Sequence, residues 1–497
     1  ALLAVLALLA GAAYWWRARQ SQISNSKPTT AAAQPAIHSL AVLPFKSLTP
    51  KTGDEYLGVG LADVLITRLS NLSQLTVRPT RSVLSFSDKD AQQAGRALRV
   101  DSVLDGSIQT IRQQSGDRVR VTVRLLRVSD GQALWAYQDD EQGNDVFQLQ
   151  DLVASNVTRA LALRLTGAEQ QRLERRYTSN AAAQQAYLKG RYHWQRWNED
   201  GLKRAVESFE QARAADPNFA LAYSGLADAW NLLGYLSFMP PREAFPKSEA
   251  AAREALRLDD ELGEAHLVLA KVRLFYDWDW SGYEHEWQRA RELNPNYWDV
   301  YGVQGTYLTI IGKFDEAITV RKQALALDPS SPLLTVQVGW PHFYARRYDD
   351  AQAWYKRALE LDPNFAQAHN DSGLCAAQQG RNDQAVNEWL KARELNHVAA
   401  ETLAALRQAF ATQGIQGFRQ KDLELTLERM KQQRVRAWQM AQLYHALGDR
   451  AQTFVWLEKA YAERDGLLPF LNVMPQYADL HDDPRFADLV RRIGLAN

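Results

Sequence analysis

A period of 34 residues in the second half of the chain constrains the fold more than any other feature. Asn294-Pro295, Asp328-Pro329, Asp362-Pro363 and Asn396-His397 follow one another at intervals of 34 residues. Proline after Asp or Asn ends one helix and starts the turn into the next. A constant period of this size indicates one supersecondary unit that stacks on copies of itself, so we expect an array of antiparallel helix pairs.

Small residues recur with the same period. Two antiparallel helices approach closely only where side chains are short, so the contact positions should carry Ala or Gly. The expected packing positions of the second helices are Ala212, Ala255, Ala290, Ala324, Ala358 and Ala392, with Ala460 two periods beyond the last. Those of the first helices are Gly305, Gly339 and Gly373, with Ala227 at the matching position upstream. We interpret these residues as helix contacts and not as ligand sites.

The combination of small residues, an aromatic side chain and a closing proline resembles tetratricopeptide repeats. We expect an all-α superhelix of about seven or eight such helix pairs between residues 180 and 465. The step from Pro217 to Asp260 is 43 residues instead of 34, so we place an insertion between two helices near residues 234–245. Residues 414–436 keep the length but lose the pattern, and we interpret them as a distorted repeat.

Both ends of the chain differ from the repeats. Residues 466–497, which contain three prolines, are expected to form a C-terminal cap. Residues 1–19 are expected to be a truncated transmembrane helix, because an apolar run is followed by Tyr14-Trp15-Trp16 and basic residues, as at a membrane interface. A signal peptide with a cleavage-like site at Ala10-Gly11-Ala12 is the alternative. The polar residues 20–37 predict a flexible linker.

Between the linker and the repeats, short apolar segments alternate with amphipathic ones. The order predicts one α+β domain at residues 38–166, with the elements β-α-β-α-β-β-β-α. The turns Ser115-Gly116-Asp117 and Ser129-Asp130-Gly131 favour antiparallel hairpins among its last three strands. Gly58-Val59-Gly60 falls inside the first helix, where we expect a tight helix–sheet contact and not a phosphate loop.

Three arginines share one face of a strand in this domain. Arg118, Arg120 and Arg124 alternate with apolar residues, and we interpret them as a solvated sheet face, with an acidic partner as the alternative. The whole chain carries 58 basic and 58 acidic residues, so no global field favours nucleic acid or an anionic membrane.

The α+β domain resembles the N-terminal domain of TolB. The resemblance rests on four stretches: Ala41-Val42-Leu43-Pro44-Phe45, the helix from Gly58 to Leu69, Asp105-Gly106-Ser107, and Arg120-Val121-Thr122-Val123-Arg124-Leu125. It continues through Tyr187-Leu188-Lys189-Gly190-Arg191-Tyr192 and Phe275-Tyr276-Asp277-Trp278-Asp279-Trp280. A membrane helix, a TolB-like domain and tetratricopeptide repeats in this order resemble the C-terminal part of bacterial membrane-spanning winged-helix transcription regulators (CadC-like).

This resemblance implies a role in sensing. DNA binding would belong to a cytoplasmic head domain outside this sequence, and the residues after about 20 would lie in the periplasm of a single-pass inner-membrane protein. A homodimer is one assembly that this resemblance allows. The basic residues after the apolar run do not settle the membrane side. Similar outer portions also follow serine/threonine kinase and adenylate cyclase heads, and an envelope scaffold without any head is a further alternative.

We expect no catalysis, cofactor or metal site. The nine histidines are scattered, and the single cysteine, Cys375, excludes an internal disulfide. An array of helix pairs instead offers a groove for a protein or peptide partner, lined by its first helices. Matching positions between repeats gives these candidate groove residues: Ser224, Asp228, Asn231, Asp299, Thr306, Trp340, Phe343, Gln367 and Asn370.

Overall fold

The computed structural model describes residues 37–48, 55–111, 118–142 and 146–495. From Ser39 onward the chain forms one compact unit. The predicted transmembrane helix (1–19) and residues 20–36 of the predicted linker lie outside the described residues. Within the described ranges, none of the helices combines the length and the apolar character that a membrane span requires.

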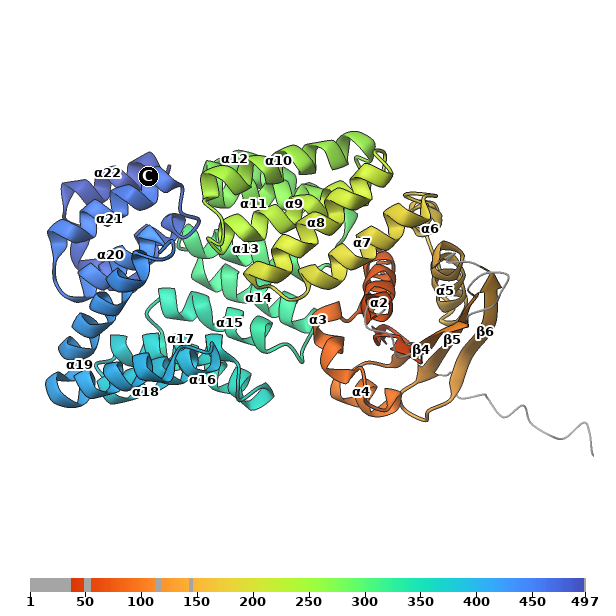
Figure 1. Cartoon of the computed structure of the whole chain (residues 1–497), viewed down its shortest axis with the longest axis horizontal. Coiled ribbons are helices and arrows are strands. Elements are labelled where there is room, and N and C mark those ends of the chain that lie inside the picture. Colours follow the sequence, from red (N-terminus) through yellow and green to blue (C-terminus); the bar gives the residue numbers. More distant parts are fainter. Residues whose placement is uncertain (1–36, 49–54, 112–117, 143–145, 496–497) are drawn as a thin grey trace, which may run out of the picture. The chain divides into compact units, whose positions relative to one another are not determined.

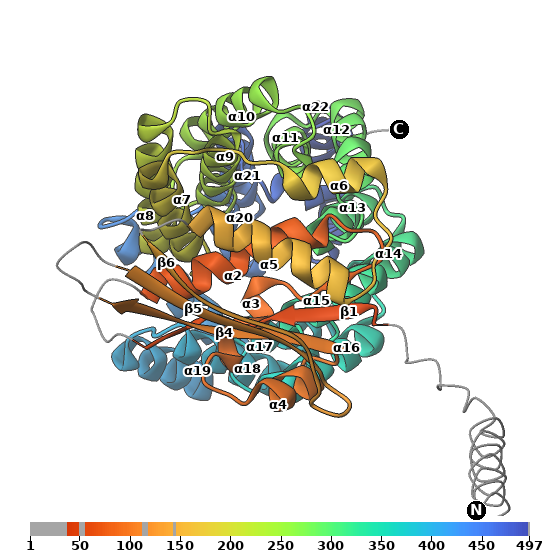
Figure 2. The same ribbon diagram turned by 90° about the vertical axis from the view of Figure 1, so that its right-hand side faces the viewer.

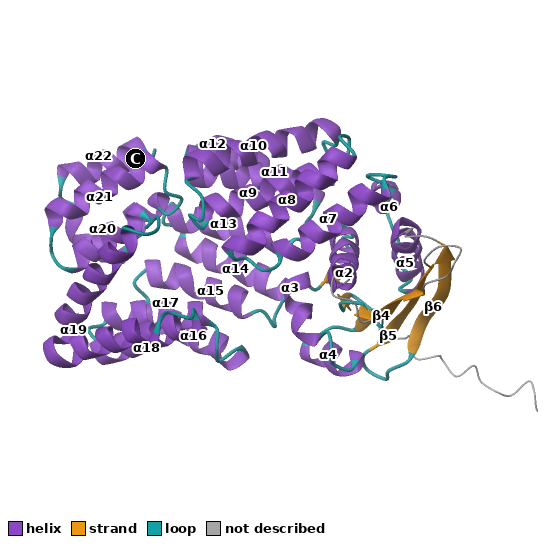
Figure 3. Cartoon of the chain, in the orientation of Figure 1, coloured by secondary structure: helices purple, strands orange, loops and turns teal. Residues whose placement is uncertain are grey.

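Strands are confined to the first part of this unit, and helices make up the rest (Figure 3). The sheet has the strand order β3-β1-β4-β5-β6, with β2 paired to β4. Strand β1 runs parallel to β3 and β4, whereas β4, β5 and β6 are antiparallel neighbours. The strands are β1 Ser39–Val42, β2 Lys46–Ser47, β3 Thr76–Val77, β4 Ser102–Ile111, β5 Arg118–Arg127 and β6 Ala133–Gln142.

Helices cover both faces of the sheet. Figure 2 shows α2 and α5 over one face and α4 against the other. The helices of this part are α2 Glu55–Ser70, α3 Thr80–Val83, α4 Ala91–Ala97, α5 Val146–Ala160 and α6 Gly167–Glu174. The predicted α+β class is confirmed, and the elements follow the predicted order with the short elements β2 and α3 and the helix α6 in addition. Alternation along β5 buries Val121, Val123 and Leu125 on the face toward the core.

The glycines in α2 allow two close backbone contacts. A Cβ on Gly58 would lie 2.0 Å from the carbonyl oxygen of Phe45, and one on Gly60 would lie 3.0 Å from Cβ of Leu188. Helix α2 therefore packs on the chain after β1 with one glycine and on the first repeat helix with the other. Gly58 therefore makes the expected tight contact beside the sheet, whereas Gly60 contacts a repeat helix instead.

The described repeats consist of helix pairs that follow one another along the chain (Figure 1). The first helices are α7 Ala181–Trp194, α9 Ala220–Tyr235, α11 Gly263–Val272, α13 Trp298–Ile310, α15 Pro332–Tyr344 and α17 Ala366–Gln378. The second helices are α8 Glu199–Ala215, α10 Pro241–Leu258, α12 Trp280–Leu293, α14 Phe314–Leu327, α16 Tyr348–Leu361 and α18 Asn382–Leu395. They are followed by α19 Ala400–Met430, α20 Ala437–Ala446 and α21 Arg450–Glu463.

The periodic small residues lie between paired helices. All six alanines from Ala212 to Ala392 are buried. Each periodic glycine faces a large side chain of its partner helix: a Cβ would lie 2.6 Å from Arg321 at Gly305, 2.4 Å from Tyr355 at Gly339 and 2.5 Å from Trp389 at Gly373. The absent side chains make room for these groups.

The additional residues of the 43-residue step are mostly helical. Helix α9 has 16 residues where α15 has 13, and α10 has 18 where α16 has 14. Pro240, with φ −53° and ψ 128°, is not helical, and Pro241 begins α10, a position where the missing amide hydrogen costs no helical bond. The expected inter-helix insertion at residues 234–245 is thus reduced to a five-residue connection, 236–240, between two longer helices.

Helix α19 is two helices joined at Gly414. This glycine has φ 62° and ψ −154°, a conformation that only glycine adopts readily. The two halves make a helix pair without a longer turn, which explains how the region of residues 414–436 keeps its length but not its pattern. Thr426, at the position where the period calls for Ala, is buried.

The C-terminal segment folds back onto the middle of the array. Its elements η3 Leu468–Val473, η4 Pro475–Leu480 and α22 Pro484–Arg492 each have a proline at the first or second position. One hydrophobic cluster joins residues of α11, α12 and α13 with residues of α20, α21 and this segment. Trp280 Nε1 also donates to the carbonyl oxygen of Gly494 (3.0 Å).

Helix α2 joins the sheet to the first repeat through Asp63. This carboxylate is 1% exposed and accepts hydrogen bonds from Thr80 Oγ1 (2.5 Å), Gln195 Nε2 (2.8 Å) and Arg191 Nε. A second contact lies farther along the array, where Asn296 Nδ2 donates to the carbonyl oxygen of Leu72 (2.8 Å). The sheet is thus held against both the first repeat and a turn between later repeats.

Candidate functional site

The candidate groove residues come from α9, α13, α15 and α17, the first helices of four repeats. The structure gathers most of them into two polar clusters. The lysine cluster consists of Lys271, Asp228 and Asp299, and the arginine cluster consists of Arg321, Thr306, Gln337, Trp340, Gln367, Asn370 and Asp371.

In the lysine cluster, Lys271 of α11 bridges two repeats. Its Nζ lies 2.6 Å from Asp299 Oδ2 and 3.3 Å from Asp228 Oδ1. Burial by itself would lower the pKa of Lys271, but the two carboxylates outweigh it and raise that pKa above its ordinary value. The lysine therefore stays charged and ties Asp228 of α9 to Asp299 of α13.

A cavity of about 20 Å³ adjoins this cluster. Its lining includes Ser224 and Asp228 from the predicted set, together with Arg191, Lys271 and Tyr297. It has room for about one water molecule, so it does not by itself accommodate a peptide side chain.

The arginine cluster is centred on a charged side chain inside the array. Arg321 of α14 is 1% exposed and donates to Thr306 Oγ1 (2.9 Å) and Gln337 Oε1 (3.1 Å). Its guanidinium also lies 5.1 Å from the ring centre of Trp340. Burial lowers the pKa of Arg321 to about 10, which still leaves it charged at neutral pH.

Asp371 binds Trp340 at the indole nitrogen. Trp340 Nε1 donates to Asp371 Oδ2 (2.8 Å), while Gln367 Nε2 (2.8 Å) and Asn370 Nδ2 (3.2 Å) donate to Oδ1. Burial raises the pKa of Asp371 to about 6, against the opposing effect of these three hydrogen bonds. Trp340 thus lies between a buried cation and a buried carboxyl group.

Matching positions between repeats did not identify Arg321 or Asp371. The sequence does contain a signal for Arg321: the positions 34 residues on either side are Trp287 and Tyr355, and the next is Trp389. Arg321 therefore stands where the other repeats have an aromatic residue. Helix packing alone does not explain an arginine at this position.

Four of the nine candidate residues are covered. Ser224, Asn231, Thr306 and Phe343 are buried, whereas Gln367 is exposed and Asn370 and Trp340 are partly exposed. The repeat period identifies the face of a helix, but it cannot show which parts of that face other segments cover. Here the C-terminal segment covers part of it, because Phe470 packs on α13 and stacks on Tyr344 at a ring distance of 5.3 Å.

Other residues marked by the sequence have structural contacts. Arg124 is 53% exposed and pairs across the strands with Asp105 at 2.6 Å, as on a solvated sheet face. The side chain of Arg118 lies outside the described part. Asp279 caps α12 by accepting from the amide of Gly282 (2.9 Å). Cys375 is buried, and burial raises its thiol pKa to about 12. The described ranges hold no group of three or more His, Cys, Asp or Glu suited to a metal ion.

A family model of the tetratricopeptide repeat matches residues 339–396. The match includes α16, α17 and α18 and confirms the predicted repeats in this segment. It also contains Trp340, Gln367, Asn370 and Asp371 of the arginine cluster.

Two curated proteins are similar to larger parts of the chain. The putative adenylate cyclase 3 of Rhizobium meliloti is 26% identical over 243 residues, which are 48% of this chain and 40% of the cyclase. The transcriptional regulator HilA of Salmonella typhimurium is 22% identical over 325 residues, which are 64% of this chain and 56% of the regulator. The matched region therefore spans about half the length of these relatives.

Solved structures with a similar chain include a human IFIT1 dimer with PPP-AAAA, which is 18% identical. The similarity covers 70% of this chain and 77% of IFIT1, at a TM-score of 0.40. The tetratricopeptide repeat protein YrrB is 19% identical, with 41% of this chain and 98% of YrrB covered, at a TM-score of 0.27.

Proposed function

We propose that this chain is the sensory and protein-interaction region of a one-component transcription regulator in the bacterial inner membrane. The observation that carries the proposal is the similarity to HilA, which extends over 64% of the chain. This share contains more residues than the segment from the start of α7 to the end of α21. The similarity is therefore not limited to the repeats.

The partner-binding surface of this proposal is the exposed side of the arginine cluster on α15 and α17. Gln367 is exposed there, and Asn370 and Trp340 are partly exposed. The corresponding face of α13 is covered by the C-terminal segment. A protein or peptide partner on α15 and α17 would meet amide donors and the edge of an aromatic ring, groups that are frequent at protein interfaces.

The anchor of this proposal is the apolar run before residue 20, with the following residues in the periplasm. A partner bound to the repeats would then change docking or dimerisation outside the membrane, and a single helix would transmit the change to a DNA-binding head. A reporter enzyme fused after Gln34 in the intact gene product tests the membrane side. Activity of a periplasm-specific reporter is the expected result, and activity of a cytoplasm-specific reporter alone would exclude this arrangement.

The regulatory role is tested by transcript profiling in the native host. A deletion strain carrying the intact wild-type gene should recover a defined set of transcripts. Gln367→Arg should reduce this recovery, because it places a cation on the proposed binding surface. Gln323→Arg makes the same change at an exposed position of the second helix α14 and should recover transcripts as the wild type does. Unchanged transcripts on deletion would contradict the regulatory role.

A second candidate function is supported by the similarity to the putative adenylate cyclase. In that case the chain would be the non-catalytic region attached to a cyclase head. The intact gene product separates the two, because a cyclase would raise cyclic AMP in a cyclase-deficient host and a transcription regulator would not.

A further inference from the structure

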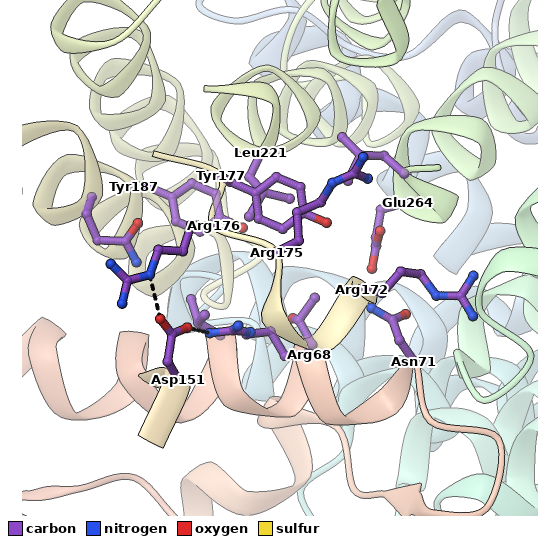
Figure 4. Close-up of a pocket in the computed structure, with 14 residues that line it drawn as sticks. Arg68, Asn71, Asp151, Arg172, Arg175, Arg176, Tyr177, Tyr187, Leu221 and Glu264 are labelled. Carbon is purple, nitrogen blue, oxygen red and sulfur yellow. Dashed lines mark hydrogen bonds and ion pairs between the residues drawn. The ribbon is translucent and has the colours of Figure 1, made fainter. Parts of the chain in front are cut away.

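A cavity of about 50 Å³ lies where the helices of the sheet-bearing part meet the first repeats. Its lining comes from α2, α5, α6, the connection to α7, and the helices α7, α9 and α11 (Figure 4). The lining includes four arginines: Arg68, Arg172, Arg175 and Arg176. A cavity needs about 10–15 Å³ to hold one water molecule, so this cavity has room for several waters or one small polyatomic ion.

Three of the four arginines form ion pairs with neighbouring carboxylates. Arg68 and Arg176 both bind Asp151, at 2.8 and 2.7 Å, and Figure 4 shows these two contacts as dashed lines. Arg175 binds Asp259 at 2.6 Å and Glu261 at 3.4 Å. The oxygens of Asp151 are therefore already occupied, and Arg175 is directed to acids outside the lining.

Arg172 differs from the other three. In the described part of the chain it has no hydrogen bond and no ion pair, and its Nε, like that of Arg68, is buried without a partner. The side-chain amide of Asn71, also in the lining, has no hydrogen-bond partner among the described residues either. A buried donor without an acceptor costs free energy, so Arg172 would gain from an acceptor in the cavity, and the partly exposed amide of Asn71 would be free to donate to the same group.

The remaining carboxyl group of the lining, Glu264, does not supply that acceptor. Its only side-chain partner among the described residues is Asn294 Nδ2, at 3.4 Å. Burial raises the pKa of Glu264 and so favours its neutral form. Burial likewise raises the pKa of the Tyr177 hydroxyl, which stays protonated. The cavity therefore offers more donors than acceptors.

We propose that this cavity binds a small oxyanion, the carboxylate or phosphate group of a small molecule, with Arg172 and Asn71 as its ligands. A guanidinium presents a planar fork of N–H groups that matches the two oxygens of such a group. Because the lining joins α2 and α6 to the repeats, the bound anion would stabilise the contact between the sheet-bearing part and the array by mass action.

Titration calorimetry of the complete chain tests this site, with inorganic phosphate and acetate as probes. Sodium chloride keeps the ionic strength constant, so that general screening does not contribute. We expect saturable binding of at least one probe and a rise in the unfolding temperature with its concentration. Loss of a charged hydrogen bond should weaken binding by about tenfold or more in Arg172→Gln, and Asn71→Ala should weaken it to a smaller extent.

Arg204→Gln is the matched control, because Arg204 lies exposed on α8 and pairs with Asp200 at 3.1 Å. It should bind the probes as the wild type does. Binding of phosphate alone, or of acetate alone, supports the site and identifies the anion class. No saturable binding of either probe, or equal binding by wild type and Arg172→Gln, would overturn the proposal. Circular dichroism verifies that each variant is folded. Anion binding in this cavity is independent of the proposed regulatory role, so either proposal can fail without the other.

Discussion

Arg321 and Asp371 show how a repeat position can acquire a charged group. Arg321 fits because Gly305 on the facing helix has no side chain, and a Cβ there would lie 2.6 Å from its Cγ. Neither charged group has an oppositely charged partner in direct contact among the described residues; both instead bind Trp340 and neutral polar groups. Buried charges arranged in this way cost stability.

The stability of the protein should depend on pH through Asp371. Burial raises the pKa of Asp371 to about 6, compared with about 3.9 in an unfolded chain. The folded state therefore binds this proton more tightly. Its contribution to stability is complete below about pH 4 and is lost as the pH rises through about 6.

This loss should amount to about 3 kcal/mol, because one pKa unit corresponds to about 1.4 kcal/mol. Urea unfolding of wild type and Asp371→Asn between pH 4 and 7.5 measures it. The difference in unfolding free energy between the two proteins should change by about this amount over the range. A pH-independent difference would show that Asp371 titrates normally.

Asp63 should contribute strongly to the contact between the sheet and the first repeat. Asp63→Ala leaves Arg191 partly buried without its carboxylate, and removing one partner of a buried pair costs about 3–5 kcal/mol. Asp105→Ala removes the partner of Arg124, which is 53% exposed, and should cost less than about 1 kcal/mol. Chemical unfolding of both variants checks this; equal losses would argue against a special role for Asp63.

At the scale of elements, the periodic glycines determine how closely the helices of a pair approach. Gly339→Ala would place a Cβ 2.4 Å from the ring of Tyr355, which is itself buried. Overpacking of this kind costs about 1–3 kcal/mol. Gly167→Ala is the control, because no atom lies within 4 Å of the added Cβ at the start of α6. Thermal unfolding should show a lower midpoint for the first variant only.

At the scale of the whole unit, the C-terminal segment makes the later repeats dependent on the earlier ones. Leu471 is fully buried in the cluster that joins this segment to α11, α12 and α13. Leu471→Asp would bury a charge there and should release the segment, whereas Leu361→Asp changes a residue that is 40% exposed.

Limited proteolysis with mass spectrometry should therefore show early cleavage between residues 464 and 483 in Leu471→Asp. The Leu361→Asp variant should be cut at the same rate as the wild type. If both variants resist the protease equally, the segment is held by its other contacts and the cluster is not essential for its position.

The repeats and the class of the first domain could be predicted from the amino-acid sequence. Both follow from local rules: the 34-residue period with its small residues, and the alternation of short strands with amphipathic helices. Position matching also identified the helices that carry Trp340, Gln367 and Asn370, because residues one period apart occupy equivalent places.

Which of these positions remain accessible depends on long-range packing and could not be predicted from the sequence. The C-terminal segment covers α13, Lys271 joins Asp228 to Asp299, and Arg172 lines a cavity with Asn71, which lies about a hundred positions earlier in the chain. Such contacts join residues far apart in the sequence, and they depend on how side chains fill space between packed elements. Periodicity records the local environment that each residue shares with its counterparts, and it contains no information about these long-range contacts.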